Sequence, residues 1–476
     1  MGLSMHSKLQ WPGLVTLGMC LGVMISLNFS AGAQNEAPGP LPIEELRAFT
    51  EVFARIKHDY VEPVDDKKLI TDAIAGMVAG LDPHSAYLQR DELRDMQVGT
   101  RGEFGGLGIE VGMEEGVIKI ISPIDDSPAS RAGVKAGDLI VKIDDTLVKG
   151  MTINDAVKRM RGKPDTKIAL TIVRKGENKP LVLTLTRAVI KVQSVKSKLL
   201  EPGYAYFRVT QFQEHTGETL ATAIQTLFQQ NQGPMKGIVL DLRNDPGGLL
   251  NGAVAVSAAF LPKNSLVVYT DGRTETAKMR LNASPDDYMA GTDTQDYLSK
   301  LPPEIKSVPM VVLVNQGSAS ASEIVAGALQ DHKRAVIMGS QTFGKASVQT
   351  ILPLGGDTAL KLTTARYYTP NGRSIQLTGI IPDIALDDGT GSDASLRFRE
   401  ADLTNHLTND RGADKAPVAV APAGSAFNFT PTPRAKDIDE KDLRPAPGEV
   451  VAKNDYELSQ AIEFLKSRGP VSASAN

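Results

Sequence analysis

Short apolar runs alternate with helical periodicity through the middle of the chain. Runs of five or six apolar residues suit buried strands, whereas apolar residues three and four positions apart suit helices that cover a sheet. This alternation predicts an α/β domain. The expected strands are residues 204–209, 237–242, 266–269, 310–314, 335–338 and 360–367, and the helices between them include 216–229 and 252–260.

Residues 104–187 have a different pattern, with shorter apolar segments and a Gly-rich turn at 105–109 that leads into a strand. We therefore expect a separate β-rich domain ahead of the α/β domain. Its further elements are expected to be strands at 117–121, 139–143 and 167–174, a short helix opening at 127–129 and a longer helix at 154–160.

Both ends of the chain contain predicted helices. Apolar residues recur at helical spacing over 43–57, and residues 69–78 form a second amphipathic pattern before a turn at 81–85. Near the C-terminus, residues 455–466 return to the same periodicity. The Pro- and Ala-rich segment before that helix indicates a flexible linker, and the tail after it is expected to be disordered.

The N-terminal segment is predicted to be a signal peptide. His6 and Lys8 supply a weak positive charge, residues 14–29 are mostly apolar, and Ala31-Gly32-Ala33 fits a cleavage site. Cys20, the only cysteine, lies in the apolar run, so the cleaved protein needs no disulfide. Export to a bacterial periplasm is the simplest expectation. An uncleaved membrane anchor is the alternative, because the apolar run approaches spanning length.

Composition argues against some classes of protein. The chain has 476 residues, enough for two or three domains, and 41% of them are hydrophobic. Its net charge of −4 argues against nucleic-acid binding, which favours a basic excess. The six histidines form no metal-binding pattern with cysteine or glutamate, so we expect neither a metal nor an organic cofactor.

The main candidate for chemistry is a serine at a strand-to-helix turn. Ser320 follows the apolar strand 310–314 and a turn at 315–317, and a helix runs on from Glu323. Free backbone N–H groups at a helix N-terminus can stabilise developing negative charge on a substrate oxygen. The alternative is structural, because Ser320 and Glu323 form a Ser-x-x-Glu capping box, which commonly starts a helix.

A lysine in a second segment can supply the base that a serine nucleophile needs. Lys345 follows Phe343 and Gly344, which suit a buried site. Burial disfavours the ammonium form and lowers the lysine pKa from about 10.4, at a cost of about 1.4 kcal/mol per pKa unit. Gln349, four residues later, shares a face with Lys345 and can orient the amine without adding charge. The alternative is an ordinary solvated lysine.

His332 offers a competing serine–histidine mechanism. It lies at the C-terminal end of the helix that begins after Ser320, where a histidine often caps the helix. We therefore expect the histidine to point away from the serine, which disfavours this mechanism.

The serine and lysine segments resemble the signature of the carboxyl-terminal processing proteases, the Ser/Lys peptidases of family S41. Matching residue by residue, the resemblance implies that Ser320 is the nucleophile, Lys345 the general base and Gln349 the residue that orients the lysine. It extends over about residues 41–384, and Ala346 stands where the family usually has glycine. The segments read Gly317-Ser318-Ala319-Ser320-Ala321-Ser322-Glu323 and Thr342-Phe343-Gly344-Lys345-Ala346-Ser347-Val348-Gln349.

The same resemblance implies an oxyanion hole after strand 237–242. One backbone N–H would come from Gly247 or Gly248, and both glycines remain candidates; Ala321 would supply the other. Asp245 stands where the family often has asparagine, and a carboxylate there would oppose an oxyanion unless it turns away. Taken alone, the Asp-Pro-Gly-Gly loop is an ordinary tight turn.

The β-rich region resembles a PDZ domain in its strand order and in its Ala-Gly-x-x-x-Gly-Asp segment, residues 132–138. By this resemblance, the carboxylate-binding loop consists of Gly106, Leu107, Gly108 and Ile109. Backbone N–H groups of such a loop bind the terminal carboxylate of a peptide that adds a strand to the sheet edge. Ile109 and Val157 would line the pocket for the last side chain.

The resemblance implies an α/β (α+β multidomain) chain with a crotonase/ClpP-like catalytic core, an inserted PDZ domain and an N-terminal helical arm. The expected boundaries are 1–33 for the signal peptide, 34–100 for the helical region, 101–188 for the PDZ domain, 189–400 for the catalytic domain, 401–450 for the linker and 451–476 for the C-terminal helix and tail.

The implied function is an exported serine endopeptidase that binds the apolar C-terminus of protein substrates and cleaves them. The helical arm would serve either self-association or packing within one chain, and an adaptor protein is a further expected partner. Two other classes stay open. An inactive scaffold would use only its PDZ domain, and a CoA-type lyase or hydratase would share the core and the oxyanion hole but commonly uses acidic residues. The Ser/Lys pair disfavours the lyase.

Overall fold

The computed structural model describes residues 42–114, 116–124, 127–177, 179–289, 295–386, 399–412, 427, 429–434 and 449–468. The predicted signal peptide, most of the predicted linker and the C-terminal tail lie outside the described residues. The chain divides into two compact units between Ala73 and Ile74.

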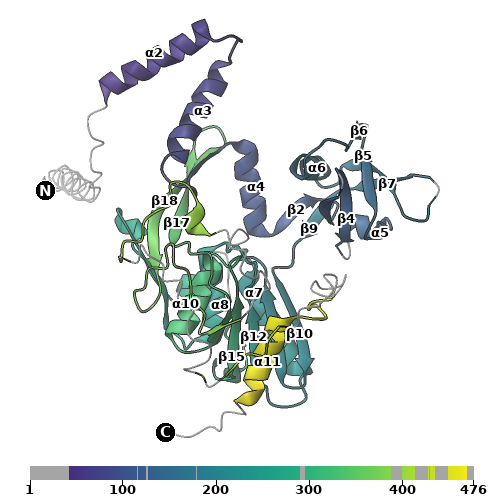
Figure 1. Cartoon of the computed structure of the whole chain (residues 1–476), viewed down its shortest axis with the longest axis vertical. Helices are drawn as coiled ribbons and strands as arrows, with labels where there is room; N and C mark the ends of the chain where they lie inside the picture. The colour runs from purple at the N-terminus through teal and green to yellow at the C-terminus, as the bar shows by residue number, and fades with distance from the viewer. Residues whose placement is uncertain are drawn as a thin grey trace, which may run out of the picture. The chain divides into compact units, whose positions relative to one another are not determined.

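A six-stranded sheet organises the α/β domain (Figure 1). Its strand order is β10-β11-β12-β15-β16-β19, and every neighbouring pair except β10 and β11 is parallel. Four of the six strands were expected from the apolar runs, and these four are confirmed. The strands are β10 (Val195–Glu201), β11 (Tyr204–Val209), β12 (Gly237–Asp241), β15 (Met310–Val314), β16 (Val336–Gly339) and β19 (Ile384–Ala385).

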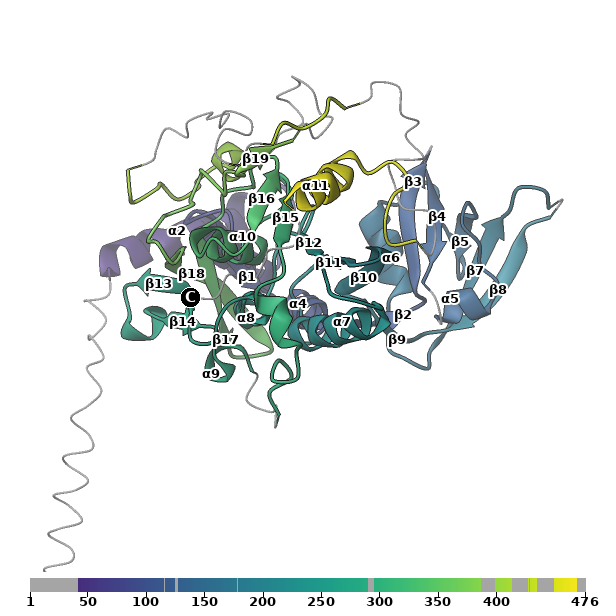
Figure 2. The same cartoon turned by 90° about the horizontal axis from the view of Figure 1, so that it is seen from below.

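Helices cover both faces of this sheet, which explains why its central strands are apolar throughout. Because alternate residues of a strand point to opposite faces, Ile238 and Leu240 pack with α7, α8 and α10, whereas Val239 packs with α11. Figure 2 shows α11 on one side of the sheet and α7 and α8 on the other. The helices are α7 (Thr216–Gln230), α8 (Leu250–Phe260), α10 (Ala321–Asp331) and α11 (Tyr456–Ser467).

A second sheet is built around β18 (Thr358–Tyr368), which pairs antiparallel with β1, β13 and β17. The ladder between β17 and β18 contains a bulge after Val348, which leaves Gln349 opposite Thr363. The segment that carries Lys345 and Gln349 therefore leads into a strand. The other strands are β1 (Ala86–Leu88), β13 (Leu266–Gly272), β14 (Arg280–Asn282) and β17 (Ser347–Leu354).

The β-rich region folds as an antiparallel sheet with two helices, in the expected element order. Its strand order is β3-β4-β5-β7-β8, so β3 lies at an edge, and β6 pairs with β5. A two-stranded ribbon of β2 (Glu103–Gly106) and β9 (Ala188–Lys191) forms where the chain enters and leaves. The other elements are β3 (Ile109–Glu114), β4 (Val117–Pro123), α5 (Pro128–Arg131), β5 (Leu139–Ile143), β6 (Thr146–Leu147), α6 (Ile153–Met160), β7 (Lys167–Val173) and β8 (Leu181–Thr186).

The predicted N-terminal helices are confirmed as α2 (Ile43–Asp59) and α3 (Asp66–Ala79). A further helix, α4 (Arg90–Arg101), was not expected because its sequence is strongly polar. Local capping explains it: Glu92 accepts a hydrogen bond from the N–H of Gln89, and Gly102 ends the helix in the left-handed conformation. Shorter helical turns are η2 (Glu275–Ala277), α9 (Pro285–Tyr288), η3 (Pro303–Lys306) and η5 (Glu400–Asp402).

Within the described ranges, no helix combines the length and the apolar character that crossing a bilayer requires.

Candidate active site

Ser320 lies on a sharp turn between β15 and α10, at a strained backbone position. Its φ of 55° and ψ of −111° fall where a residue with a side chain rarely sits. Such a conformation costs on the order of 1–3 kcal/mol and persists only where its surroundings enforce it. A strained strand-to-helix turn is also the device by which several hydrolases expose a nucleophilic serine. The sequence predicted the turn, but not its strain.

Glu323 connects the serine segment with the lysine segment. Its carboxylate is fully buried and accepts hydrogen bonds from the backbone N–H groups of Ser320 (2.8 Å) and Lys345 (3.0 Å). The N–H of Gly344 (2.7 Å) and the hydroxyl of Thr342 (2.5 Å) donate to its other oxygen. The predicted capping contact from Glu323 to Ser320 is therefore present. The same carboxylate also holds the chain around Lys345.

Tyr367 joins the same two segments through their carbonyl groups. Its buried hydroxyl contacts the carbonyl oxygen of Ser320 at 3.1 Å and also that of Lys345. Burial and the nearby carboxylates of Glu323 and Glu400 raise the pKa of the phenol well above its usual value, so it stays a neutral donor. The backbone around Ser320 and Lys345 is thus fixed through both its N–H groups and its carbonyl groups.

The Lys345 amine is largely buried and has an uncharged neighbour. Its Nζ donates to Oε1 of Gln349 at 2.8 Å. Burial, and to a smaller degree the positive charge of Lys361, lowers the pKa of Lys345 to about 8, although the carboxylates of Glu400, Glu323 and Asp82 oppose this shift. A substantial fraction of the amine is therefore neutral near pH 8. The charged residues around the amine are Lys361, Glu400, Glu323 and Asp82.

Ser320 and Lys345 belong to segments that lie side by side, but within the described part of the chain no hydrogen bond joins their side chains. The amine donates to Gln349 instead. Hydrogen bonds between catalytic groups are often loose without substrate and tighten when it binds.

The Gly-rich loop approaches Ser320 closely. A Cβ on Gly247 would come within 2.9 Å of the Ser320 Cβ and 2.7 Å of the Ala319 carbonyl, so only glycine fits. The N–H of Gly247 donates to the Asp245 carboxylate at 2.9 Å. Among the described residues, no acceptor is bound to the N–H of Gly248 or of Ala321. These two groups are thus the candidates for an oxyanion hole, and Gly248 fits better than Gly247.

Asp245 is fully buried beneath this loop. One of its carboxylate oxygens accepts from Gly247, and the other has no hydrogen-bond partner among the described residues. Burial raises the pKa of Asp245 to about 7. When protonated it is neutral, like the asparagine that the sequence comparison led us to expect. Its charge therefore opposes a nearby oxyanion chiefly above neutral pH.

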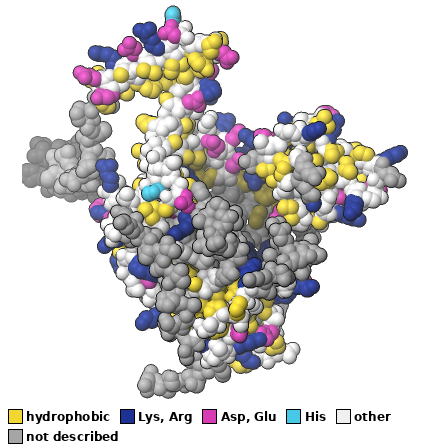
Figure 3. Space-filling model, viewed as in Figure 1, with side chains coloured by type: hydrophobic (Ala, Val, Ile, Leu, Met, Phe, Trp, Pro, Cys, Tyr) yellow, Lys and Arg dark blue, Asp and Glu magenta, His cyan; other side chains and the backbone are white. Residues whose placement is uncertain are grey.

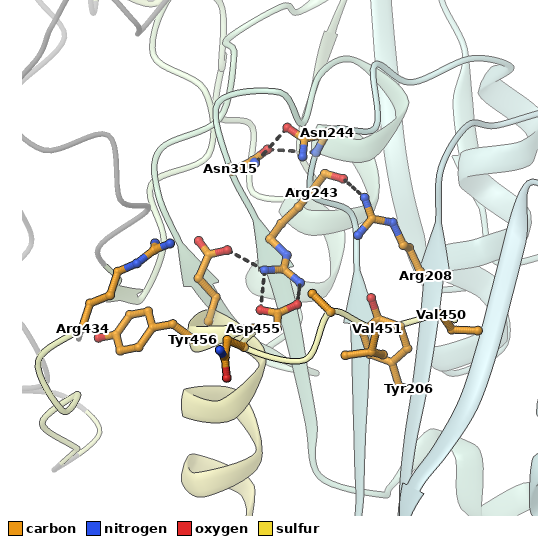
Figure 4. Close-up of a pocket in the computed structure, with 13 residues that line it drawn as sticks. Tyr206, Arg208, Arg243, Asn244, Asn315, Arg434, Val450, Val451, Asp455 and Tyr456 are labelled. Carbon is orange, nitrogen blue, oxygen red and sulfur yellow. Dashed lines mark hydrogen bonds and ion pairs between the residues drawn. The ribbon is translucent and has the colours of Figure 1, made fainter. Parts of the chain in front are cut away.

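The C-terminal helix is tied to the same loop (Figure 4). Arg243 donates to Asp455 (2.8 Å) and to Glu457 (2.5 Å) at the start of α11. The next residue, Asn244, exchanges two hydrogen bonds of 2.9 and 3.0 Å with Asn315, which lies in the turn before Ser320. These residues line a pocket in which Arg243 pairs with the carboxylates of Asp455 and Glu457, and this pairing favours a structural role for the arginine.

The predicted carboxylate-binding loop lies between β2 and β3, at the sheet edge. Leu107 is buried, and Gly108 has a φ of 73° that suits glycine. The Gly108 carbonyl accepts from the Ser127 hydroxyl and from the Ile124 N–H, which anchors the loop from behind. Ile109 and Val157, expected to line the peptide pocket, both pack at the margin of the domain core.

His332 does not take part in the site. It caps the C-terminal end of α10, the end away from Ser320, and its Nε2 contacts the Leu266 carbonyl oxygen at 2.7 Å. Within the ranges described, no group of three or more His, Cys, Asp or Glu side chains could hold a metal ion.

Sequence reasoning did not identify Tyr367, Thr363 or Asp82 as neighbours of the lysine segment. Tyr367 and Thr363 belong to β18, whose register against β17 no local pattern reveals. The only sequence signal for Asp82 is a turn, Leu-Asp-Pro-His-Ser, which looks ordinary without its tertiary partners.

Comparisons with known proteins follow the same division of the chain. Residues 203–386 match the model of peptidase family S41, residues 119–174 a PDZ domain, and residues 26–92 the N-terminal domain of the activating protease CtpB. A carboxy-terminal-processing protease of Bartonella bacilliformis is 47% identical over 403 residues, which cover 83% of this chain and 86% of that protein.

Two further relatives are more distant. The carboxy-terminal processing protease CtpA of Bacillus subtilis is 33% identical over 80% of this chain and 76% of its own length. The solved structure of a photosystem II D1 C-terminal processing protease is 32% identical and covers 71% of this chain and 86% of that one, with a TM-score of 0.41. With a buried lysine held beside a serine turn and 47% identity to such a protease over 403 aligned residues, this chain belongs to the carboxy-terminal processing proteases of peptidase family S41.

Proposed function

We propose that this protein is an exported serine endopeptidase in which Ser320 is the nucleophile and Lys345 the general base. The observation that supports this most directly is the lysine environment. The amine is buried beside an uncharged amide, and its segment is bound to the serine turn through Glu323 and Tyr367. An ordinary surface lysine has no such surroundings.

The reaction begins when neutral Lys345 takes the proton of the Ser320 hydroxyl as the serine oxygen bonds to the substrate carbonyl carbon. The N–H groups of Gly248 and Ala321 stabilise the resulting oxyanion. The C–N bond then breaks, and protonated Lys345 gives its proton to the leaving amine. Water then attacks the acyl-enzyme carbonyl carbon while Lys345 takes one of its protons. The ester C–O bond breaks, Lys345 returns the proton to the Ser320 oxygen, and the product leaves with a new C-terminal carboxyl group.

The PDZ domain would hold the C-terminus of a protein substrate. The edge strand β3 can pair with an extended peptide, and the loop at Leu107 and Gly108 can bind its terminal carboxylate. Holding the tail in this way raises the effective concentration of the preceding chain near Ser320. An apolar last residue fits the side chains of Ile109 and Val157.

Export to the periplasm, with the N-terminal segment cleaved or kept as an anchor, remains part of the proposal and rests on the sequence pattern alone. Association with an adaptor protein likewise rests on the sequence resemblance. No structural feature is assigned to either of them.

We also propose that α2 mediates self-association. No residue of α2 is buried, and hydrophobic side chains run along the helix (Figure 3). An apolar row of this length that the described part of the chain leaves exposed is a common sign of a protein interface. The exposed residues of the row are Ile43, Leu46, Phe49, Val52 and Ile56.

A lyase or hydratase of the crotonase-like class is a weaker alternative. It would share the oxyanion loop but would leave the buried Lys345 and the PDZ domain without a role. An assay with unfolded casein and the protein from residue 34 to 476 separates the three classes, because only the protease would cleave casein.

We predict that Ser320→Ala and Lys345→Ala each lower kcat/KM for casein by about a thousandfold, whereas Lys333→Ala, at an exposed lysine, has no effect.

For the wild type, kcat/KM should rise with pH and level off above about 8, because only the neutral Lys345 amine accepts the serine proton. Cleavage that survives Ser320→Ala, or a profile that is flat from pH 6 to 9, would contradict the proposed dyad.

We predict that Glu323→Gln lowers both activity and melting temperature. The amide puts an NH2 group where an oxygen now accepts two hydrogen bonds, and each buried donor left unpaired costs about 1–3 kcal/mol. The matched control is Glu218→Gln, at the corresponding third position of α7, where the side chain is exposed. Thermal unfolding and casein assays at pH 8 measure both effects. If the two variants have the same activity and melting temperature, Glu323 does not organise the site.

Substrate peptides should distinguish a free C-terminus from a blocked one. We expect that amidation of an apolar C-terminus raises KM about tenfold or more, because the loop N–H groups lose a charged acceptor. The value of kcat should change much less, since the scissile bond lies elsewhere. Steady-state kinetics on a matched pair of peptides measures this, and equal KM values would argue against carboxylate binding by the PDZ domain.

If α2 mediates self-association, Phe49→Glu should lower the mass of the particle in solution, because a charge in an apolar contact is costly. Arg47→Glu introduces the same side chain on the opposite face of the helix and should leave the mass unchanged. Light scattering coupled to gel filtration, at matched concentrations, gives the masses. A wild-type mass equal to that of one chain would refute the proposal.

A further inference from the structure

The turn that follows α3 contains polar side chains that are almost completely buried. Asp82 is 4% exposed and Ser85 is 6% exposed. Asp82 accepts hydrogen bonds from the N–H groups of His84 and Ser85 and from the Ser85 hydroxyl (2.6 Å), so the turn is rigid by itself. Strand β1 follows at once and pairs with β18, which places this turn beside Thr363.

A first chain of hydrogen bonds leads from this turn to the Lys345 amine. The Thr363 hydroxyl donates to the Asp82 carboxylate at 3.0 Å. Since its proton is used there, the Thr363 oxygen is an acceptor for the Gln349 NH2 group, also at 3.0 Å. The other end of the Gln349 amide then accepts from Lys345 Nζ at 2.8 Å. In this series Lys345 donates to Gln349, Gln349 donates to Thr363, and Thr363 donates to Asp82.

A second chain reaches the backbone next to Lys345. Nε2 of His84 contacts the buried Glu400 carboxylate at 2.8 Å. Glu400 also accepts from the Gln376 NH2 group at 3.0 Å. The side-chain amide oxygen of Gln376, Oε1, accepts from the N–H of Ala346 at 2.8 Å. The same turn is therefore linked to the lysine segment at two places, the Lys345 side chain and the Ala346 backbone.

We propose that the turn at Asp82–Ser85 is a positioning element for the general base, and that Asp82 and Thr363 act by fixing the orientation of the Gln349 amide. The inference rests on the proposed protease function and deepens it. Asp82 and Thr363 reach the Lys345 amine only through Gln349 in this series, so they are positioning residues rather than catalytic ones.

The argument depends on the two unlike ends of an amide. Only its oxygen can accept a hydrogen bond from the lysine; a flipped Gln349 would present two donors to an amine that is itself a donor when charged. The Gln349 NH2 group has two acceptors, Ser347 Oγ at 3.0 Å and Thr363 Oγ1 at 3.0 Å. A hydroxyl alone could serve as donor or acceptor. The carboxylate of Asp82 can only accept, and it therefore sets the direction of the whole series.

The test compares Thr363→Val, Thr363→Ser and Thr364→Val in the full chain, together with Ser320→Ala. Valine at 363 keeps the shape and removes the acceptor, whereas serine keeps the acceptor. Thr364→Val is the matched control, because that neighbour forms a cross-strand hydroxyl contact with Thr350 away from the lysine. We expect Thr363→Val to lower kcat about ten- to hundredfold with KM unchanged, while Thr363→Ser and Thr364→Val stay within about threefold of wild type.

A second readout separates positioning from general loss of stability. In Thr363→Val the Gln349 amide is no longer held, and its oxygen can turn away from the Lys345 amine. That oxygen is an acceptor that favours the ammonium form, so without it the pKa of Lys345 falls and the acid limb of kcat/KM moves to lower pH. Partial unfolding would lower activity at every pH without this shift. In addition, Thr363→Val should have little further effect in a Gln349→Met background, because both changes act through one amide.

Three outcomes would overturn the inference: equal effects of Thr363→Val and Thr364→Val, an unshifted acid limb, or independent effects of Thr363→Val and Gln349→Met that multiply. The proposed protease function is judged separately. If casein is cleaved by the wild type and not by Ser320→Ala, the function stands whatever Thr363 does. If the wild type does not cleave casein, the proposed protease function is refuted, and the positioning role that rests on it is refuted as well.

Discussion

A lysine can serve as a base for serine only while its amine is uncharged, and this requirement constrains everything around Lys345. Burial lowers the amine pKa to about 8. A carboxylate in direct contact would reverse that effect, and the contacting group is instead the neutral amide of Gln349. The acidic side chain closest in sequence to the serine, Glu323, is directed to backbone N–H groups, where it organises the chain instead of pairing with the amine.

The two candidate catalytic segments come from different sheets, so their mutual position needs connections of its own. Glu323 supplies one of them through N–H groups, and Tyr367 supplies another through carbonyl groups. The strained conformation of Ser320 fits this picture, because a residue remains at such a φ only when several contacts enforce it. On the far side of the serine, Asn244 and Asn315 connect the Gly-rich loop to the same turn. The fold thus fixes the backbone around Ser320 and Lys345 and thereby restricts the conformations of these two side chains.

Patterns local in sequence predicted much of this arrangement. The apolar runs gave correct strand positions because the sheet is covered on both faces, and the turn before Ser320 followed from a strand ending in Asn-Gln-Gly. What the sequence could not show depends on register and on tertiary partners. The neighbour of Gln349 is Thr363 only because a bulge after Val348 shifts the ladder. Similarly, the sequence could not distinguish Gly247 from Gly248 as the oxyanion-hole candidate. The distinction depends on the Asp245 side chain, which accepts a hydrogen bond from the N–H of Gly247.

The acidic groups around Lys345 show how positioning and base strength oppose one another. Glu323, Glu400 and Asp82 each hold part of the lysine segment, and each also raises the pKa of the amine. Every carboxylate that improves the geometry therefore reduces the neutral fraction at a given pH. Desolvation and the charge of Lys361 act in the other direction and prevail. These carboxylates accept hydrogen bonds from backbone, hydroxyl, amide and imidazole groups, and among the described residues none of them forms an ion pair with the amine. The lysine segment is thus held in place while the pKa of the amine stays at about 8.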